Sequence, residues 1–180
     1  MKQRFALTRT IVFTAAFAAL CFVGTVGIAI PLPFGYANAG DIAVLLSGFC
    51  LGPWLGGIAA ALGSALADLV LGYTIYAPAT ALIKFGVALL CALTFRIFCR
   101  MLSKKGARIA VRVVCCALGE CVMLLGYFLY EWLLWGFGGA VATLTGNALQ
   151  AVVAIVGTSL VLGALAPIRA IQRIFPSINP

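Results

Sequence analysis

Ionisable side chains inside apolar stretches are the residues through which this sequence could do chemistry. The chain has four carboxylates, Asp41, Asp68, Glu120 and Glu131, and one lysine, Lys84, that lies well inside an apolar run. A charge at membrane depth costs at least about 2.5–3.5 kcal/mol on insertion scales, so it usually faces a partner or a water-filled cavity. We predict an ion pair between Asp68 and Lys84 across the short loop that separates their segments, either within a binding site or as a purely structural contact.

Further polar side chains recur at helical spacing in the second half of the chain. Glu120, Tyr127 and Glu131 are seven and four residues apart, which places them on one stripe of a helix. Asn147 and Gln150 are three residues apart and share one face of the next helix. Polar stripes that face inward indicate a cavity between the helices.

Tyrosines cluster next to the carboxylates. Tyr36 precedes Asp41, while Tyr73 and Tyr76 follow Asp68, all in short segments between apolar runs. An aromatic belt at the membrane interface is the alternative for this group, and it is our interpretation of the nearby tryptophans. An outward-opening pocket with aromatic walls and a few polar groups suits a small ring-containing ligand.

Several kinds of chemistry are excluded by residue types that the sequence lacks. It has no histidine, which removes histidine-based triads, HExxH zinc sites and haem ligation by histidine. Its seven cysteines include no Cys-x-x-Cys pair, and no phosphate-binding loop motif occurs. We therefore expect no enzyme, no catalytic residue, no metal site and no cofactor.

Composition places the polar residues in membrane-spanning helices. The 180 residues are 64% hydrophobic and 9% charged, whereas soluble domains carry about 25% charged residues. A spanning helix needs about 20 predominantly apolar residues. We predict a single all-α membrane domain over residues 1–180, with six transmembrane helices at about residues 8–30, 39–51, 54–72, 78–98, 109–132 and 140–166.

The twelve Lys and Arg residues set the predicted orientation. Apart from Lys84, they flank the apolar runs in three groups, before the first helix, around residues 96–112 and after the last helix. Such groups stay on the cytoplasmic side, so an even number of crossings must separate the first group from the group at residues 96–112. A single helix over residues 42–76 would give three crossings, whereas two helices give four. The block must therefore split, and we place the break at Gly52-Pro53. Both termini are then cytoplasmic. The net charge of +8 reflects this topology and contacts with anionic lipids, not nucleic-acid binding.

A dense run of motifs lies between residues 38 and 84. Its members are Asn38-Ala-Gly-Asp41, Leu45-Leu-Ser-Gly48, Leu51-Gly-Pro53, Gly63-Ser64, Ala67-Asp68-Leu69, Gly72-Tyr73 and Tyr76-Ala-Pro-Ala-Thr80, followed by Lys84. This run resembles the S components of energy-coupling factor (ECF) vitamin transporters, most closely the subgroup linked with hydroxymethylpyrimidine and pyridoxine. The resemblance implies a subunit of the prokaryotic plasma membrane that binds a vitamin outside and associates with a transmembrane coupling subunit and two cytoplasmic ATPases.

The resemblance also implies roles for individual residues. Ala15 and Ala19 of the first helix would dock on the coupling subunit. We expect the ligand to be a small aromatic vitamin or precursor. The alternative is pantothenate, whose carboxylate could pair with Lys84, or another vitamin. Hydrogen bonds would come from Asn38, Asp41, Asp68, Tyr73, Lys84, Glu131 and Asn147, and ring stacking from Tyr36, Tyr76 and Tyr127.

A stand-alone carrier driven by protons or sodium is the alternative from a different functional class. Glu120, near the membrane midplane, would be its coupling site. The sequence lacks the twofold hydropathy repeat typical of such carriers, and proton ionophores would distinguish the two mechanisms in transport assays.

Overall fold

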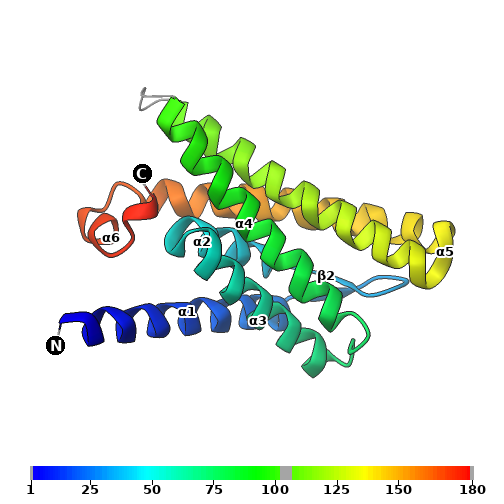
Figure 1. The fold of residues 1–180 in the computed structure, drawn as a ribbon. Coiled ribbons are helices and arrows are strands. Elements are labelled where there is room, and N and C mark those ends of the chain that lie inside the picture. The colour runs from blue at the N-terminus through cyan, green and yellow to red at the C-terminus, as the bar shows by residue number, and fades with distance from the viewer. Residues whose placement is uncertain (1, 102–106, 179–180) are drawn as a thin grey trace.

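The structure, a computed structural model, describes residues 2–101 and 107–178 as a bundle of helices with one short hairpin (Figure 1). Its elements are α1 (Lys2–Gly27), β1 (Ala29–Pro31), β2 (Tyr36–Asn38), α2 (Asp41–Leu51), α3 (Pro53–Leu71), α4 (Ala77–Met101), α5 (Ala107–Leu165), α6 (Arg169–Ile174) and the 3-10 turn η1 (Pro176–Ile178). In the described ranges, four segments are long and apolar enough to cross a membrane: Leu7–Gly27, Pro53–Leu71, Ala77–Met101 and Arg108–Leu165. The predicted class, a helical membrane protein, is therefore confirmed.

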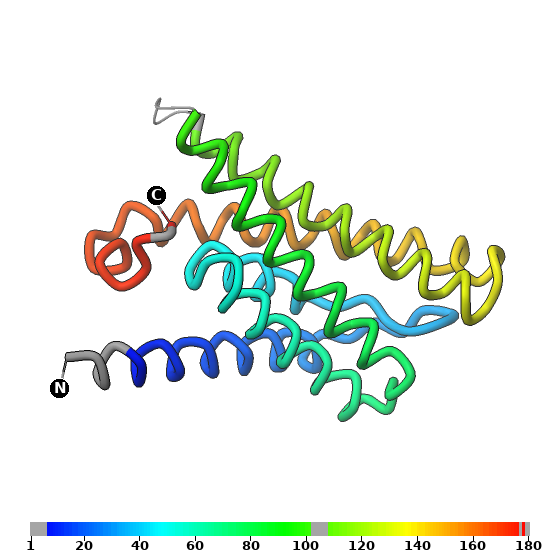
Figure 2. The backbone as a smooth tube through the Cα atoms, in the orientation of Figure 1, coloured from blue at the N-terminus to red at the C-terminus, as the bar shows by residue number. Residues whose placement is uncertain are grey.

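Helix α5 reverses direction at Gly136. The 59 residues of α5 would extend about 89 Å as one straight helix, far more than a bilayer core of about 30 Å. Gly136 has φ +75° and ψ 175°, a conformation that only glycine adopts readily, and it joins two helices across a kink. Figure 2 shows the chain turning back there. The helices predicted at 109–132 and 140–166 are the two halves of α5.

The predicted break at Gly52-Pro53 separates α2 from α3. Gly52 has φ +83° and ends α2, and Pro53 begins α3, where its missing N–H costs no hydrogen bond. With only 11 residues, α2 is about 17 Å long and lies in the middle of the bundle, packed against α1, α3, α4 and α5.

A β-hairpin that the sequence pattern did not predict precedes α2. β1 and β2 are antiparallel, with Ala29 opposite Asn38 and Pro31 opposite Tyr36. The first helix therefore ends at Gly27 rather than at residue 30. The hairpin leads to Gly40, where a Cβ would lie 2.9 Å from the Asn38 Oδ1 atom, so only glycine fits. This close packing places Asn38 and Asp41 inside the bundle.

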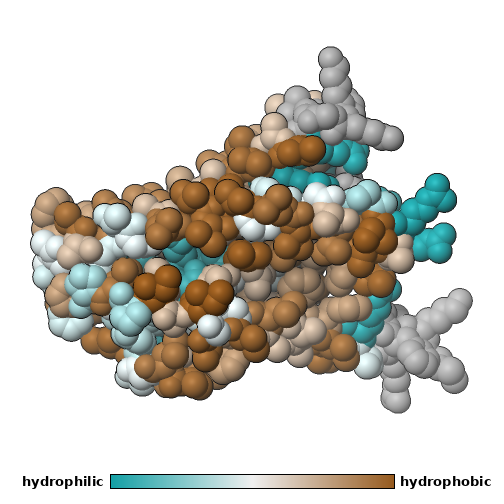
Figure 3. All heavy atoms as spheres, turned by 180° about the vertical axis from the view of Figure 1, so that it is seen from behind, coloured by the Kyte–Doolittle hydropathy of each residue, from teal (hydrophilic) through white to brown (hydrophobic). Residues whose placement is uncertain are grey.

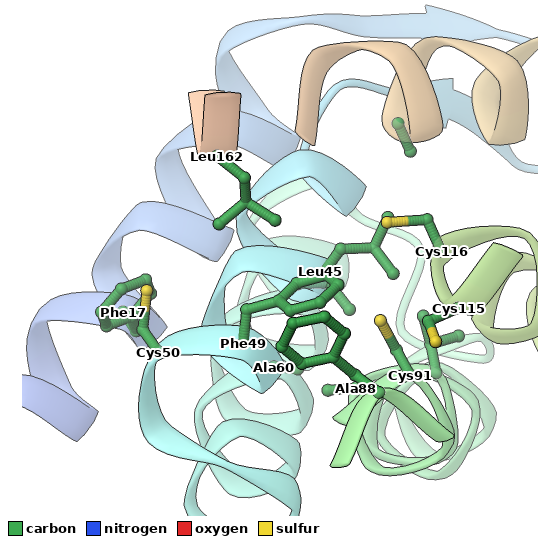
Figure 4. Packing of buried hydrophobic residues seen from close by; sticks show 14 of the residues in the cluster. Phe17, Leu45, Phe49, Cys50, Ala60, Ala88, Cys91, Cys115, Cys116 and Leu162 are labelled. Atoms are coloured by element: carbon green, nitrogen blue, oxygen red, sulfur yellow. The ribbon is translucent and has the colours of Figure 1, made fainter. Parts of the chain in front are cut away.

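A hydrophobic cluster centred on α2 holds the helices together. Leu45 and Phe49 of α2 meet Cys91 of α4 and Cys116 of α5 (Figure 4). The Phe49 ring packs edge-on against Phe95, with centroids 4.9 Å apart. The cysteines in this cluster are free and act as small apolar side chains.

The two ends of the bundle differ in character. Figure 3 shows an apolar band across the middle of the molecule, with hydrophilic residues gathered at one end. We call this the basic end. It holds the start of α1, α6, and the ends of α4 and α5 that flank residues 102–106 (Figure 1), and the described cations of these segments include Arg9, Arg100, Arg108, Arg169 and Arg173. Lys104 and Lys105 lie outside the described residues. The opposite end, which we call the hairpin end, carries the β-hairpin, the turn between α3 and α4, and the reversal of α5 (Figure 1).

Candidate ligand-binding pocket

Lys84 forms a buried ion pair with Asp41, not with Asp68. The Lys84 Nζ atom lies 2.5 Å from Oδ1 and 2.8 Å from Oδ2 of Asp41, and both side chains are at most 2% exposed. The predicted Asp68–Lys84 pair is therefore wrong. The hairpin brings Asp41, the first residue of α2, to the depth of Lys84. The spacing of residues in the sequence does not predict this contact.

Asp68 is instead held by a tyrosine of the hairpin. The Tyr36 hydroxyl donates a hydrogen bond of 2.5 Å to Oδ1 of Asp68. Burial raises the pKa of Tyr36 above its ordinary value, and the hydrogen bond to Asp68 raises it further, so the phenol stays protonated and remains a donor. Oδ2 of Asp68 is buried and has no hydrogen-bond partner among the described residues, although the Thr80 hydroxyl interacts favourably with this carboxyl group.

Gln150 connects the ion pair to the hairpin. Its Nε2 atom donates to Oδ2 of Asp41 at 2.5 Å, and its Oε1 atom accepts from the backbone N–H of Asn38 at 2.7 Å. The Asn38 Oδ1 atom in turn accepts from the N–H of Gly40 at 2.8 Å. This network links the hairpin, α2, α4 and the second half of α5, so it fixes the wall of the pocket.

A polar cavity lies at the hairpin end, and Asn38 and Gln150 of this network form part of its lining. It is lined by Gly35, Tyr36, Asn38, Asp68, Tyr76, Thr80, Tyr127, Glu131, Asn147 and Gln150. Its volume is about 20 Å³, which is room for about one water molecule. The Tyr127 hydroxyl lies 3.0 Å from the Thr80 hydroxyl, and the Thr143 hydroxyl donates to Glu131. Donors and acceptors from four elements and two loops thus converge on one small space.

Aromatic rings border the cavity. The centroids of Tyr36 and Tyr73 are 4.8 Å apart, and those of Tyr76 and Tyr130 are 5.6 Å apart. Trp135 donates from Nε1 to the Tyr76 hydroxyl at 3.1 Å. Burial raises the pKa of Tyr76 as well. Most of these rings come from the hairpin and from the turn between α3 and α4.

The structure brings the predicted site residues together. Seven of the ten line the cavity: Tyr36, Asn38, Asp68, Tyr76, Tyr127, Glu131 and Asn147. Each of the other three residues contacts a residue of the cavity wall. Asp41 is bonded to Gln150, and the Tyr73 ring packs against Tyr36. The Lys84 Nζ atom lies 5.2 Å from the centroid of the Tyr127 ring.

Three lining residues, Gly35, Thr80 and Gln150, were missing from the predicted set. Gln150 shares a helical face with Asn147, and Thr80 lies one helical turn before Lys84, so the spacing contained a signal for both. Glu120 does not line the cavity; it is 1% exposed, and neither of its carboxyl oxygens has a hydrogen-bond partner among the described residues. Ala15 and Ala19 do not line the pocket and are exposed on α1.

The fold and the pocket define a helical membrane protein with a polar cavity near one end. Comparison with known sequences gives the particular family: residues 6–167 match the ECF-type riboflavin transporter S component family, and the chain belongs to this family. It is therefore a substrate-binding membrane subunit of an ECF transporter and not an enzyme. A Pyrococcus woesei protein, described as an uncharacterized protein in the gap 3′ region, is 38% identical over 136 residues, covering 74% of this chain and 86% of the relative.

Proposed function

We propose that this S component captures a single-ring aromatic vitamin or vitamin precursor, with pyridoxine or hydroxymethylpyrimidine as the favoured ligand. The observation that carries the proposal is the polar cavity bordered by tyrosine rings. Tyr36 and Tyr76 offer stacking surfaces, while Asn147 and Thr80 offer hydrogen bonds. The three-ring system of riboflavin would require a larger expansion of a cavity of about 20 Å³ than a single ring would.

Ligand entry requires the tyrosines to move. Tyr36 belongs to the hairpin, and Tyr73 and Tyr76 belong to the turn between α3 and α4. Short connecting segments can shift without separating the helices that they join. We therefore place ligand entry at the hairpin end, between these two segments.

The proposed topology has six crossings, with the hairpin end outside the cell and both termini in the cytoplasm. It counts α1, α2, α3, α4 and the two halves of α5. The basic end supports this orientation, because Arg-rich ends remain cytoplasmic. Although α2 is too short to cross alone, it starts at Asp41 inside the bundle, and the hairpin provides the rest of that crossing.

The proposed partners are a transmembrane coupling subunit and two cytoplasmic ATPases. Exposed Ala15 and Ala19 lie four residues apart on α1 and leave a flat surface on which another helix could pack closely. The family supports such an assembly, and we place the docking surface on this face of α1.

Calorimetric titration of the detergent-purified protein tests the ligand. We expect one-to-one binding of pyridoxine or hydroxymethylpyrimidine, and none of comparable strength for pantothenate, thiamine or riboflavin. Asn147→Leu should weaken binding, because Asn147 is buried in the pocket wall, whereas the matched control Thr145→Leu on the exposed face should not. Tight binding of riboflavin, or no binding by a folded, ligand-free protein, would refute the proposal.

A further inference from the structure

The carboxyl groups of this protein are concentrated in its interior. All four, Asp41, Asp68, Glu120 and Glu131, are at most 3% exposed. Asp68 and Glu131 line the pocket, and Asp41 accepts a hydrogen bond from the lining residue Gln150. Since a buried charge needs a compensating partner, the electrostatic balance of the pocket depends on which cations are close.

The nearby cation is already fully engaged. Lys84 contacts both oxygens of Asp41, and the carboxylate also accepts from Gln150. The ten described residues that line the cavity include no lysine or arginine. The ammonium of Lys84 therefore neutralises Asp41, and neither Asp68 nor Glu131 forms an ion pair with a Lys or Arg among the described residues.

One of those wall carboxyl groups has spare hydrogen-bonding capacity. Oδ2 of Asp68 is buried at the cavity with no hydrogen bond among the described residues, apart from the favourable interaction of the carboxyl group with the Thr80 hydroxyl, while Oδ1 is occupied by Tyr36. An unsatisfied buried acceptor is costly, and a donor on a ligand would remove that cost. A carboxylate or phosphate on a ligand would add negative charge beside Asp68 and Glu131, or would require both to be protonated.

We infer that the pocket selects ligands that carry a cationic or hydrogen-bond-donating nitrogen and rejects those that carry a carboxylate or a phosphate. The inference rests on the proposed function and specifies its substrate class by charge. It also removes pantothenate, because Lys84 is not free to pair with the carboxylate of that compound.

A series of related pyridine compounds tests this selectivity. Pyridoxamine, pyridoxine and 4-pyridoxic acid differ only at ring position 4, where they carry an aminomethyl, a hydroxymethyl and a carboxylate group. Pyridoxine 5′-phosphate keeps the hydroxymethyl group at position 4 and adds a phosphate on the substituent at position 5. Calorimetry on the full-length protein should find the two acidic compounds at least about tenfold weaker than pyridoxamine. If hydroxymethylpyrimidine binds instead, its phosphate ester should be weaker by the same factor.

The outcomes separate the inference from the proposed function. Equal binding of the acidic and non-acidic forms would overturn the charge selectivity and leave a single-ring transporter subunit in place. A panel with no binding at all would overturn the proposed function itself, and the selectivity with it.

Charge-neutral variants test whether the carboxyl groups of the pocket wall cause this selectivity. Asp68→Asn keeps an oxygen that accepts the hydrogen bond from Tyr36. It should reduce the preference for pyridoxamine over 4-pyridoxic acid by at least about fivefold. Glu120→Gln is the matched control, because Glu120 is equally buried but does not line the cavity, so the preference should stay within about twofold. Glu131→Gln provides a second wall variant if Asp68→Asn does not fold. An unchanged preference in the folded wall variants would overturn the inference.

Discussion

Removal of the Lys84 ammonium tests the position of the buried ion pair. In Lys84→Met most of the side-chain volume is kept, but Asp41 loses its ionic partner where it is only 1% exposed. Breaking a buried pair by removing one partner costs about 3–5 kcal/mol. Because Gln150 still donates to Asp41, we expect a loss near the lower end, about 3 kcal/mol in the free energy of unfolding, measured by denaturant titration in detergent micelles.

The double variant Asp41→Asn/Lys84→Met shows which carboxylate is the partner. It leaves no unpaired charge, so it should be more stable than Lys84→Met alone. The matched control is Asp68→Asn/Lys84→Met, in which the two effects should add, because Asp68 is bonded to Tyr36 instead. Recovery of stability in the Asp68 double variant, with additivity in the Asp41 double variant, would refute the pairing.

Three further results are expected. Ala15→Trp should block co-purification with the coupling subunit while ligand affinity is unchanged, and a normal yield of complex would count against docking on α1. Tyr36→Phe removes the hydrogen bond to Asp68 and should cost about 1–3 kcal/mol of stability and weaken ligand binding; wild-type affinity by calorimetry would exclude this role. Gly56→Ala puts a Cβ 2.6 Å from the Ser47 carbonyl oxygen, so we expect a loss of about 1–3 kcal/mol in unfolding free energy, and wild-type stability would show that α2 and α3 can separate without cost.

The sequence predicted the break between α2 and α3 but not the β-hairpin. The break at Gly52-Pro53 was predictable, because the charge pattern required an additional crossing and proline favours the start of a helix. The hairpin at residues 29–38 was not, since its two strands of three residues are shorter than the alternation needed to identify a strand. Its register depends on packing against α1 and α5.

Composition and spacing alone determined that this is a helical membrane protein, and they identified most of the polar residues around the pocket. Hydropathy is a property of each segment, and helical spacing fixes which side chains share a face. The partner of Lys84 was decided only by tertiary structure. Asp41 and Asp68 were both possible from the sequence, and the choice followed from the depth at which the hairpin inserts the first residue of α2 into the bundle.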